Sequence, residues 1–174
     1  MAQLPSPPGL PGAGNGGVDV FLSIQSKRAG KIKGEAQSPD HRDEIVVNGW
    51  QWGVAASSSI GSAQATARRS YKNLVVTKRV DSATTGLLSV LATNDEVREA
   101  KLSMRKAGEG QRDYFSITLN NARVTAVDLD CDEHGQTLER VTFSFTKVQV
   151  DYEVQQSTGQ RGAGFSFQDE ILPA

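Results

Sequence analysis

The 174-residue chain is poor in cysteine and has no long apolar run. Its single cysteine, Cys131, excludes an internal disulfide and is typical of a reducing compartment. No apolar run approaches the roughly 18 residues of a membrane span, and residues 1–17 lack the charged start and apolar centre of a signal peptide. The sequence therefore predicts a protein made in the cytoplasm, without membrane insertion, that needs another route if it leaves the cell.

The chain also lacks an excess of charge of either sign. Its 19 Lys and Arg residues are interspersed with 20 Asp and Glu residues, which gives a formal net charge of -1 and a pI of about 6.1. Nucleic-acid-binding domains carry a basic excess. The composition therefore predicts no nucleic-acid partner.

Histidine, the side chain most used in acid–base catalysis, occurs twice, as His41 and His134. A hydrolase triad can be drawn from His41 and the many serines, but both histidines stand in charged turn sequences, which favours surface positions. No glycine-rich phosphate or dinucleotide motif is present. We therefore predict no catalytic residue and no cofactor.

An acidic stretch partly matches a calcium loop, with carboxylates at alternate positions 128, 130 and 132, but Glu133 stands where the loop needs glycine. Cys131 and His134 have the spacing of metal ligands but lack a second pair. A solvated hairpin tip with an exposed Cys131 is the favoured interpretation, and no metal site is predicted.

Apolar residues at alternate positions, as at Val18, Val20, Leu22 and Ile24, indicate half-buried strands. Further strands are predicted over residues 44–55, 71–80, 99–106, 113–120, 122–130 and 137–154. The parity of the apolar positions flips at Gly49 and again within 145–148, which indicates bulges in a strongly bent sheet. The predicted class is all-β with one short α-helix, and the predicted architecture is a small β-barrel.

The one helix is predicted after residue 80, where Asp81 or Ser82 can act as its cap. Its apolar stripe falls at i, i+3, i+4 and i+7, on Thr84, Leu87, Leu88 and Leu91. Residues 18–155 are predicted to form the barrel domain. Residues 1–17 are predicted to form a flexible Pro/Gly-rich arm, and residues 156–174 are predicted to form a loosely ordered tail.

Two tryptophans, Trp50 and Trp52, share one strand face. They are interpreted as part of a filled barrel core. The alternative is a cavity lining, which would suit a monomeric ligand-binding β-barrel.

Four segments carry a family resemblance. They are residues 19–22 (DVFL), 32–35 (IKGE), 50–53 (WQWG) and 100–109 (AKLSMRKAGE). In this order they resemble the Hcp (haemolysin-coregulated protein) family, over about residues 18–154. Three features differ from the family pattern: the 17-residue prefix, a longer connection at 25–31, and Thr84-Thr85-Gly86 where a proline is frequent.

The resemblance implies a structural protein rather than an enzyme. It implies a homohexameric ring, stacking of rings into the inner tube of the type VI secretion system, and secretion through that machine without a signal peptide. Implied partners are further copies of the chain, the VgrG spike protein, sheath subunits and baseplate, and small effector proteins in the lumen. The alternative within the same class is a tail-tube protein of a phage or another contractile injection particle.

Rings and stacks need two different, complementary faces on each subunit. Three segments are candidates: the turn at 33–35, the Ser/Ala/Gly-rich segment from 57 to 71, which by resemblance is a loop that reaches other subunits, and the turn at 105–109. The candidate interface residues are Lys33, Gly34, Glu35, Ser57, Ser58, Ser59, Gln64, Arg68, Arg69, Tyr71, Arg105, Lys106, Gly108 and Glu109.

Overall fold

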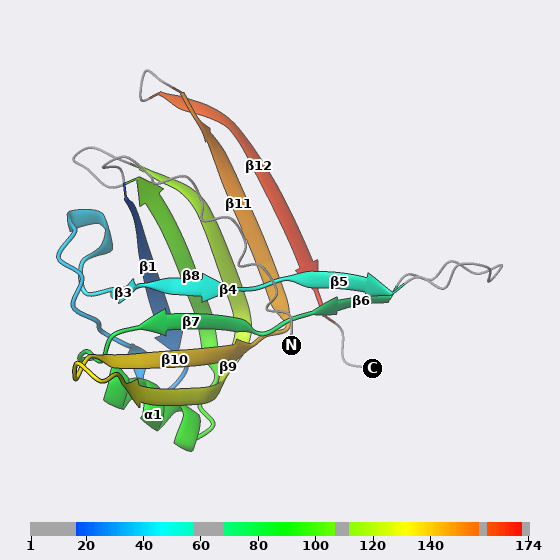
Figure 1. Ribbon diagram of the computed structural model, residues 1–174. Coiled ribbons are helices and arrows are strands. Elements are labelled where there is room, and N and C mark those ends of the chain that lie inside the picture. Colours follow the sequence, from blue (N-terminus) through cyan, green and yellow to red (C-terminus); the bar gives the residue numbers. More distant parts are fainter. Residues whose placement is uncertain (1–16, 58–67, 107–111, 157–159, 172–174) are drawn as a thin grey trace, which may run out of the picture.

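The computed structural model describes residues 17–57, 68–106, 112–156 and 160–171 (Figure 1). The predicted arm, apart from Gly17, lies outside the described residues, and so do residues 58–67 of the candidate loop. The described chain is mostly strand with one α-helix. The predicted all-β class with one short helix is therefore confirmed.

The elements follow one another as β1 (Val18–Ser26), β2 (Gly30–Lys31), the 3-10 turn η1 (Pro39–His41), β3 (Ile45–Val47), β4 (Gly49–Gln51), β5 (Val54–Ser57), β6 (Arg68–Tyr71), β7 (Leu74–Lys78), α1 (Thr84–Ala92), β8 (Val97–Lys106), β9 (Asp113–Cys131), β10 (Thr137–Ser144), β11 (Lys147–Gln155) and β12 (Arg161–Glu170).

One antiparallel sheet contains ten of these strands, in the order β2-β1-β8-β9-β10-β7-β4, with β11 and β12 beside β9 and with β3 beside β1. Its longest strand is β9, which pairs with β8 and β11 along its first part and with β10 along its second. The sequence predicted two strands here. They are one strand, which continues through Asn121 although this residue takes a left-handed φ of 47°, a conformation that asparagine tolerates.

The predicted closed barrel is wrong, although the sheet is strongly curved (Figure 1). The segment 45–51 pairs first with β1, where Ile45 lies opposite Leu22, and then with β7, where Trp50 lies opposite Val76. The parity flip at Gly49 marks this change of partner, so no single strand pairs with both ends of the sheet along its length. The flip within 145–148 likewise separates β10 from β11.

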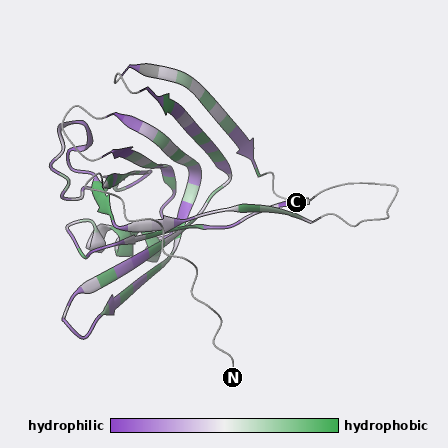
Figure 2. Cartoon of the chain, turned by 45° about the horizontal axis from the view of Figure 1, so that its top comes forward, coloured by the Kyte–Doolittle hydropathy of each residue, from purple (hydrophilic) through white to green (hydrophobic). Residues whose placement is uncertain are grey.

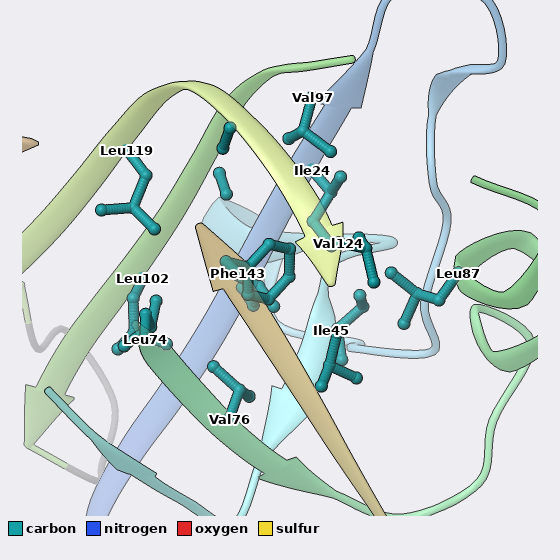
Figure 3. Close-up of a cluster of buried hydrophobic side chains, with 14 of the residues drawn as sticks. Ile24, Ile45, Leu74, Val76, Leu87, Val97, Leu102, Leu119, Val124 and Phe143 are labelled. Atoms are coloured by element: carbon teal, nitrogen blue, oxygen red, sulfur yellow. The ribbon is translucent and has the colours of Figure 1, made fainter. Parts of the chain in front are cut away.

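Buried apolar side chains from both arms of the curved sheet form one core (Figure 3). Phe143 lies among side chains of other strands, including Leu102, Leu74 and Val76, and all four are completely buried. Trp50 and Trp52 pack against this cluster, as predicted for core residues.

The helix α1 packs against β9 and buries Thr84, Leu87 and Val90. Leu88, predicted on the buried stripe, is 39% exposed. The residue at the helix N-cap is Ala83, which has no capping side chain, but the Asp81 carboxylate accepts the Ala83 N–H at 2.9 Å and so caps the turn that leads into α1. In the described ranges, no helix has the length and apolar content needed to cross a membrane.

A fully buried ion pair ties the start of α1 to the sheet. Lys78 of β7 and Glu139 of β10 lie directly opposite each other, with Nζ 2.6 Å from Oε2. Lys78 Nζ also lies 2.8 Å from Asp81 Oδ1, and the Thr84 hydroxyl donates to Glu139 Oε2 at 2.7 Å. Both ends of the pair are completely buried, and among the described residues Glu139 Oε1 has no hydrogen-bond partner. This charge cluster thus links β7, β10, the first residue of α1 and the turn between β7 and α1.

The predicted loose tail is wrong over Arg161–Glu170, which form β12 and pair with β11. Phe165 and Phe167 alternate with polar residues and lie opposite Tyr152 and Val150 of β11. This period-two pattern is that of a strand. The hairpin of β11 and β12 stands out from the curved part of the sheet in Figure 1.

Candidate functional site

The hairpin of β5 and β6 projects sideways from the rest of the chain (Figure 1) and forms a two-stranded sheet of its own. Every residue of β5 is exposed. Because an isolated two-stranded hairpin is marginally stable in water, this one depends on contacts at its base. The hairpin contains the described ends of the predicted loop at 57–71, including Ser57, Arg69 and Tyr71.

Those contacts meet at Asp169 of β12. Arg69 donates to both carboxylate oxygens, from Nη2 to Oδ1 at 3.0 Å and from Nε to Oδ2. The Tyr71 hydroxyl donates to Oδ2 at 2.5 Å. The Tyr71 ring packs against Trp52 and edge-on against Phe145, with both centroid distances 6.0 Å. We call the group Arg69, Tyr71 and Asp169 the hairpin joint.

The hairpin joint binds the ionised form of Asp169. Hydrogen bonds from Arg69 and then Tyr71 hold the pKa of the Asp169 carboxyl below its usual value, while Asp169 raises the pKa of Arg69. Burial, followed by the hydrogen bond to Asp169, raises the pKa of the Tyr71 phenol. The joint is therefore at full strength above the pKa of an unfolded aspartate, about 4, and is lost as pH falls through the lower pKa of the folded carboxyl.

A second surface continues the core face of the sheet onto β11 and β12. Directly paired residues lie on the same face of a sheet, so two rows can be followed from the buried interior outward. They are Leu22, Leu102, Ile117, Val150, Phe167 and Val20, Met104, Phe115, Tyr152, Phe165. The outermost side chains remain exposed: Tyr152 by 44%, Phe165 by 61% and Phe167 by 48%. Figure 2 shows hydrophobic bands recurring along the hairpin of β11 and β12. We call these three residues the apolar stripe.

The opposite face of the same strands is polar. One row there consists of Ser103, Ser116, Asp151 and Ser166. The Asp151 carboxylate accepts hydrogen bonds from Ser166 Oγ at 2.6 Å and from Gln149 Nε2 at 3.0 Å. A groove of about 340 Å³ at this end of the sheet is lined by residues of both faces, among them Ser116, Asp151 and Ser166 of the polar row and Phe115, Tyr152 and Phe165 of the apolar one. The sheet thus presents one face rich in hydroxyl and amide groups and one apolar face.

The turn at 33–35 is exposed at its two charged residues and packed inside the subunit at its glycine. Lys33 and Glu35 are exposed, but Gly34 is buried. A Cβ atom at Gly34 would lie 2.4 Å from the carbonyl oxygen of Glu44. The Gly34 N–H donates to the Asp43 carbonyl at 2.8 Å. The glycine is therefore required by a close backbone crossing.

The turn at 105–109 is described only at its start. The Arg105 guanidinium carbon lies 5.1 Å from the centroid of the Phe21 ring, and Arg105 Nε lies 3.8 Å from Asp19 Oδ2. Lys106 is exposed. The predicted interface residues outside the described part of the chain are Ser58, Ser59, Gln64, Gly108, Glu109 and the side chain of Arg68. The interface roles of all these residues stay predictions.

The prediction that His41 is a surface residue is wrong. His41 is buried and stacks on Phe21, with ring centroids 4.4 Å apart. Its Nδ1 lies 2.6 Å from Glu44 Oε2, and its Nε2 lies 2.8 Å from Asp113 Oδ1. Both ring nitrogens face carboxylates, so neither faces a serine hydroxyl as a hydrolase triad would require. His41 links η1 to the first residue of β9.

The β9–β10 hairpin carries the other candidate ligands. His134 and Cys131 are exposed, as predicted. The Asp132 carboxylate accepts the N–H groups of His134 and Gln136 at 2.9 and 2.8 Å, which are contacts of an ordinary turn. In the described ranges, no three side chains of the metal-binding types are grouped as a metal site would need.

Comparison with known proteins gives a consistent result. Residues 21–152 match the family described as "Type VI secretion system effector, Hcp". The chain is 34% identical to "Protein hcp1" of Pseudomonas aeruginosa over 151 residues, which cover 84% of this chain and 90% of that protein. It is 26% identical to "Major exported protein" of the same organism over 160 residues, with coverage of 80% and 92%. The crystal structure of Hcp1 from Salmonella typhimurium superposes with a TM-score of 0.69 at 27% identity and covers 88% of this chain and 94% of its own.

Proposed function

The chain belongs to the Hcp family of the type VI secretion system, and from that premise we propose that it is the tube subunit: copies form a hexameric ring, and rings stack into a tube with effectors in its lumen. Sheath and baseplate proteins would surround such a tube, and a VgrG spike would sit at its end. Secretion of the subunit itself is supported by its likeness to an exported relative.

The observation that carries the proposal is the apolar stripe, Tyr152, Phe165 and Phe167. These side chains continue the core face of the sheet beyond the part that the subunit covers by itself. Fully burying an exposed large apolar side chain contributes about 1.5–3 kcal/mol. These three side chains are about half exposed, so a second copy packed over the stripe gains part of that free energy from each of them. A stripe that meets a different surface of the neighbour makes a heterologous contact, and a heterologous contact can close into a ring.

Two further surfaces fit the same arrangement. The projecting β5–β6 hairpin reaches away from the subunit, as an element that touches another ring would. The polar face of β8, β9 and β11 offers hydroxyl and amide groups with charges of both signs, which suits a lumen wall that passes different proteins without binding them tightly. A monomeric ligand-binding barrel is less well supported, because Phe143 and its neighbours fill the inside of the curve.

Light scattering tests the ring directly. The wild-type protein should have about six times the subunit mass of 18.7 kDa. The double variant Phe165→Ser/Phe167→Ser should fall to the single-subunit mass, because the contact loses both aromatic rings. Its circular dichroism spectrum should be unchanged, since both side chains are exposed in the subunit.

Leu129→Ser is the matched control, because Leu129 is a large apolar residue of similar exposure, 54%, at the end of β9. This variant should keep the mass of the wild type. A wild-type protein that is purely monomeric at micromolar concentration would contradict the proposal, and so would intact rings in the double variant.

A further inference from the structure

We propose that Asp169 is a positioning residue that fixes the direction in which the β5–β6 hairpin leaves the subunit, and so couples that hairpin to the C-terminal β11–β12 hairpin. The identity of the surface that the hairpin contacts in an assembly rests on the proposed function. The direction itself is a property of a single folded chain.

The backbone sets this direction only in part, because β5 and β6 continue β4 and β7 after two residues on each side. Among the described residues, β5 and β6 pair only with each other and form a separate sheet. The backbone bond from Lys72 N–H to the Gly53 carbonyl, 2.9 Å, closes the base of the hairpin where the β4–β7 and β5–β6 ladders meet. Contact between the hairpin and β12 therefore depends on side chains.

The hairpin joint has the geometry for this task. Arg69 and Tyr71 are two residues apart on β6 and so lie on the same side of the strand. Both donate to one carboxylate, and the guanidinium engages both of its oxygens. Paired donors of a planar guanidinium fix the relative orientation of the two groups, which a single point contact cannot do.

Both ends of the joint are anchored. Asp169 lies on β12 directly opposite Val148, a buried residue of β11 that belongs to the core. Tyr71 continues from the carboxylate into the aromatic group of Trp52 and Phe145. A displacement of the C-terminal hairpin is thus transmitted to β6 through one carboxylate.

A positioning role predicts a local effect. The Arg69 side chain is 57% exposed, and ion pairs at exposed positions contribute little to global stability. Loss of the joint should therefore leave the melting temperature of the sheet nearly unchanged and loosen the β5–β6 hairpin alone.

Hydrogen–deuterium exchange measured by mass spectrometry separates these effects. Asp169→Asn should raise the exchange rate of amides in 54–57 and 69–71 roughly tenfold, the factor expected when a hydrogen bond to a charged group is lost. Exchange in β8 and β9 should not change. Tyr71→Phe removes only one donor from the joint and should raise the same rates by a smaller factor.

Glu170→Gln is the control, because the Glu170 carboxylate lies 3.9 Å from Lys147 and takes no part in the joint. The Glu170 backbone N–H, which donates to Asp169 Oδ1 at 2.9 Å, is retained in this variant. It should leave hairpin exchange at the wild-type rate. The measurement is repeated in the Phe165→Ser/Phe167→Ser background, so that ring formation does not influence the result. Unchanged hairpin exchange in Asp169→Asn, or an equal rise in every strand, would overturn the proposal whatever the oligomeric state.

Discussion

Lys78→Met should lower the free energy of unfolding by about 3–5 kcal/mol, because it leaves a buried charge without its partner. Glu139 is completely buried and directly opposite Lys78, and its Oε1 already lacks a hydrogen bond within the described part of the chain. Removal of the ammonium leaves only the Thr84 hydroxyl on Glu139 Oε2. Urea unfolding at a fixed protein concentration measures the change, since stability of an assembling protein depends on concentration.

The double variant Lys78→Met/Glu139→Leu is the control for this prediction. It replaces the whole pair by apolar side chains of similar volume, which is often neutral or stabilising. Most of the lost stability should therefore return, because the Asp81 carboxylate, which also loses Lys78, keeps its hydrogen bond from the Ala83 N–H. A single variant that loses less than about 1 kcal/mol, within the range of an exposed pair, would contradict the buried-pair argument, as would a double variant no more stable than the single one.

Gly34→Ala should destabilise the fold by roughly 3 kcal/mol, the upper end of the usual cost of overpacking. The added methyl group would lie 2.4 Å from the Glu44 carbonyl oxygen and 2.7 Å from the Ile45 Cα. Both are backbone atoms next to β3, so no side chain can move aside to make room. The thermal midpoint measured by circular dichroism should fall accordingly.

Gly49→Ala is the matched comparison for Gly34→Ala. Gly49 begins β4, and a Cβ there would meet nothing closer than the Thr77 Cβ at 4.0 Å. Its thermal midpoint should stay near that of the wild type. Equal losses in the two variants would show that loss of glycine, rather than the close crossing at 34, is responsible.

The alternation of apolar residues was enough to predict the class, most strand positions and the single helix. Alternation states which side chains share a face but not which strands pair. The continuous β9, the change of partner at 45–51 and the pairing of β12 with β11 were therefore missed. The Phe165 and Phe167 alternation was the available signal for β12, but the surrounding glycines and polar residues obscured it.

The polar interior was less predictable still. Lys78 and Glu139 are 61 residues apart, and His41 and Asp113 are 72 apart. Each of these residues is of a type that is usually exposed to solvent, and only the fold brings it to its partner. The hairpin joint has the same origin, because Asp169 lies in the region predicted as a loose tail. No local feature of the sequence therefore marked these residues as buried or paired.

The position of β1 in the sheet bears on how the chain folds. Its longest ladder is with β8, in which Val18 lies opposite Lys106. The ladder therefore cannot be completed until the chain has been synthesised as far as β8. The hairpin of β8 and β9 and the hairpin of β9 and β10 join neighbouring segments, and such local pairs close faster than distant ones. We therefore expect residues 97–144 to form the folding nucleus, with the N-terminal strand docking late against an edge of β8 that stays open until then. That open edge is where a nascent chain is most exposed to misassembly with another copy.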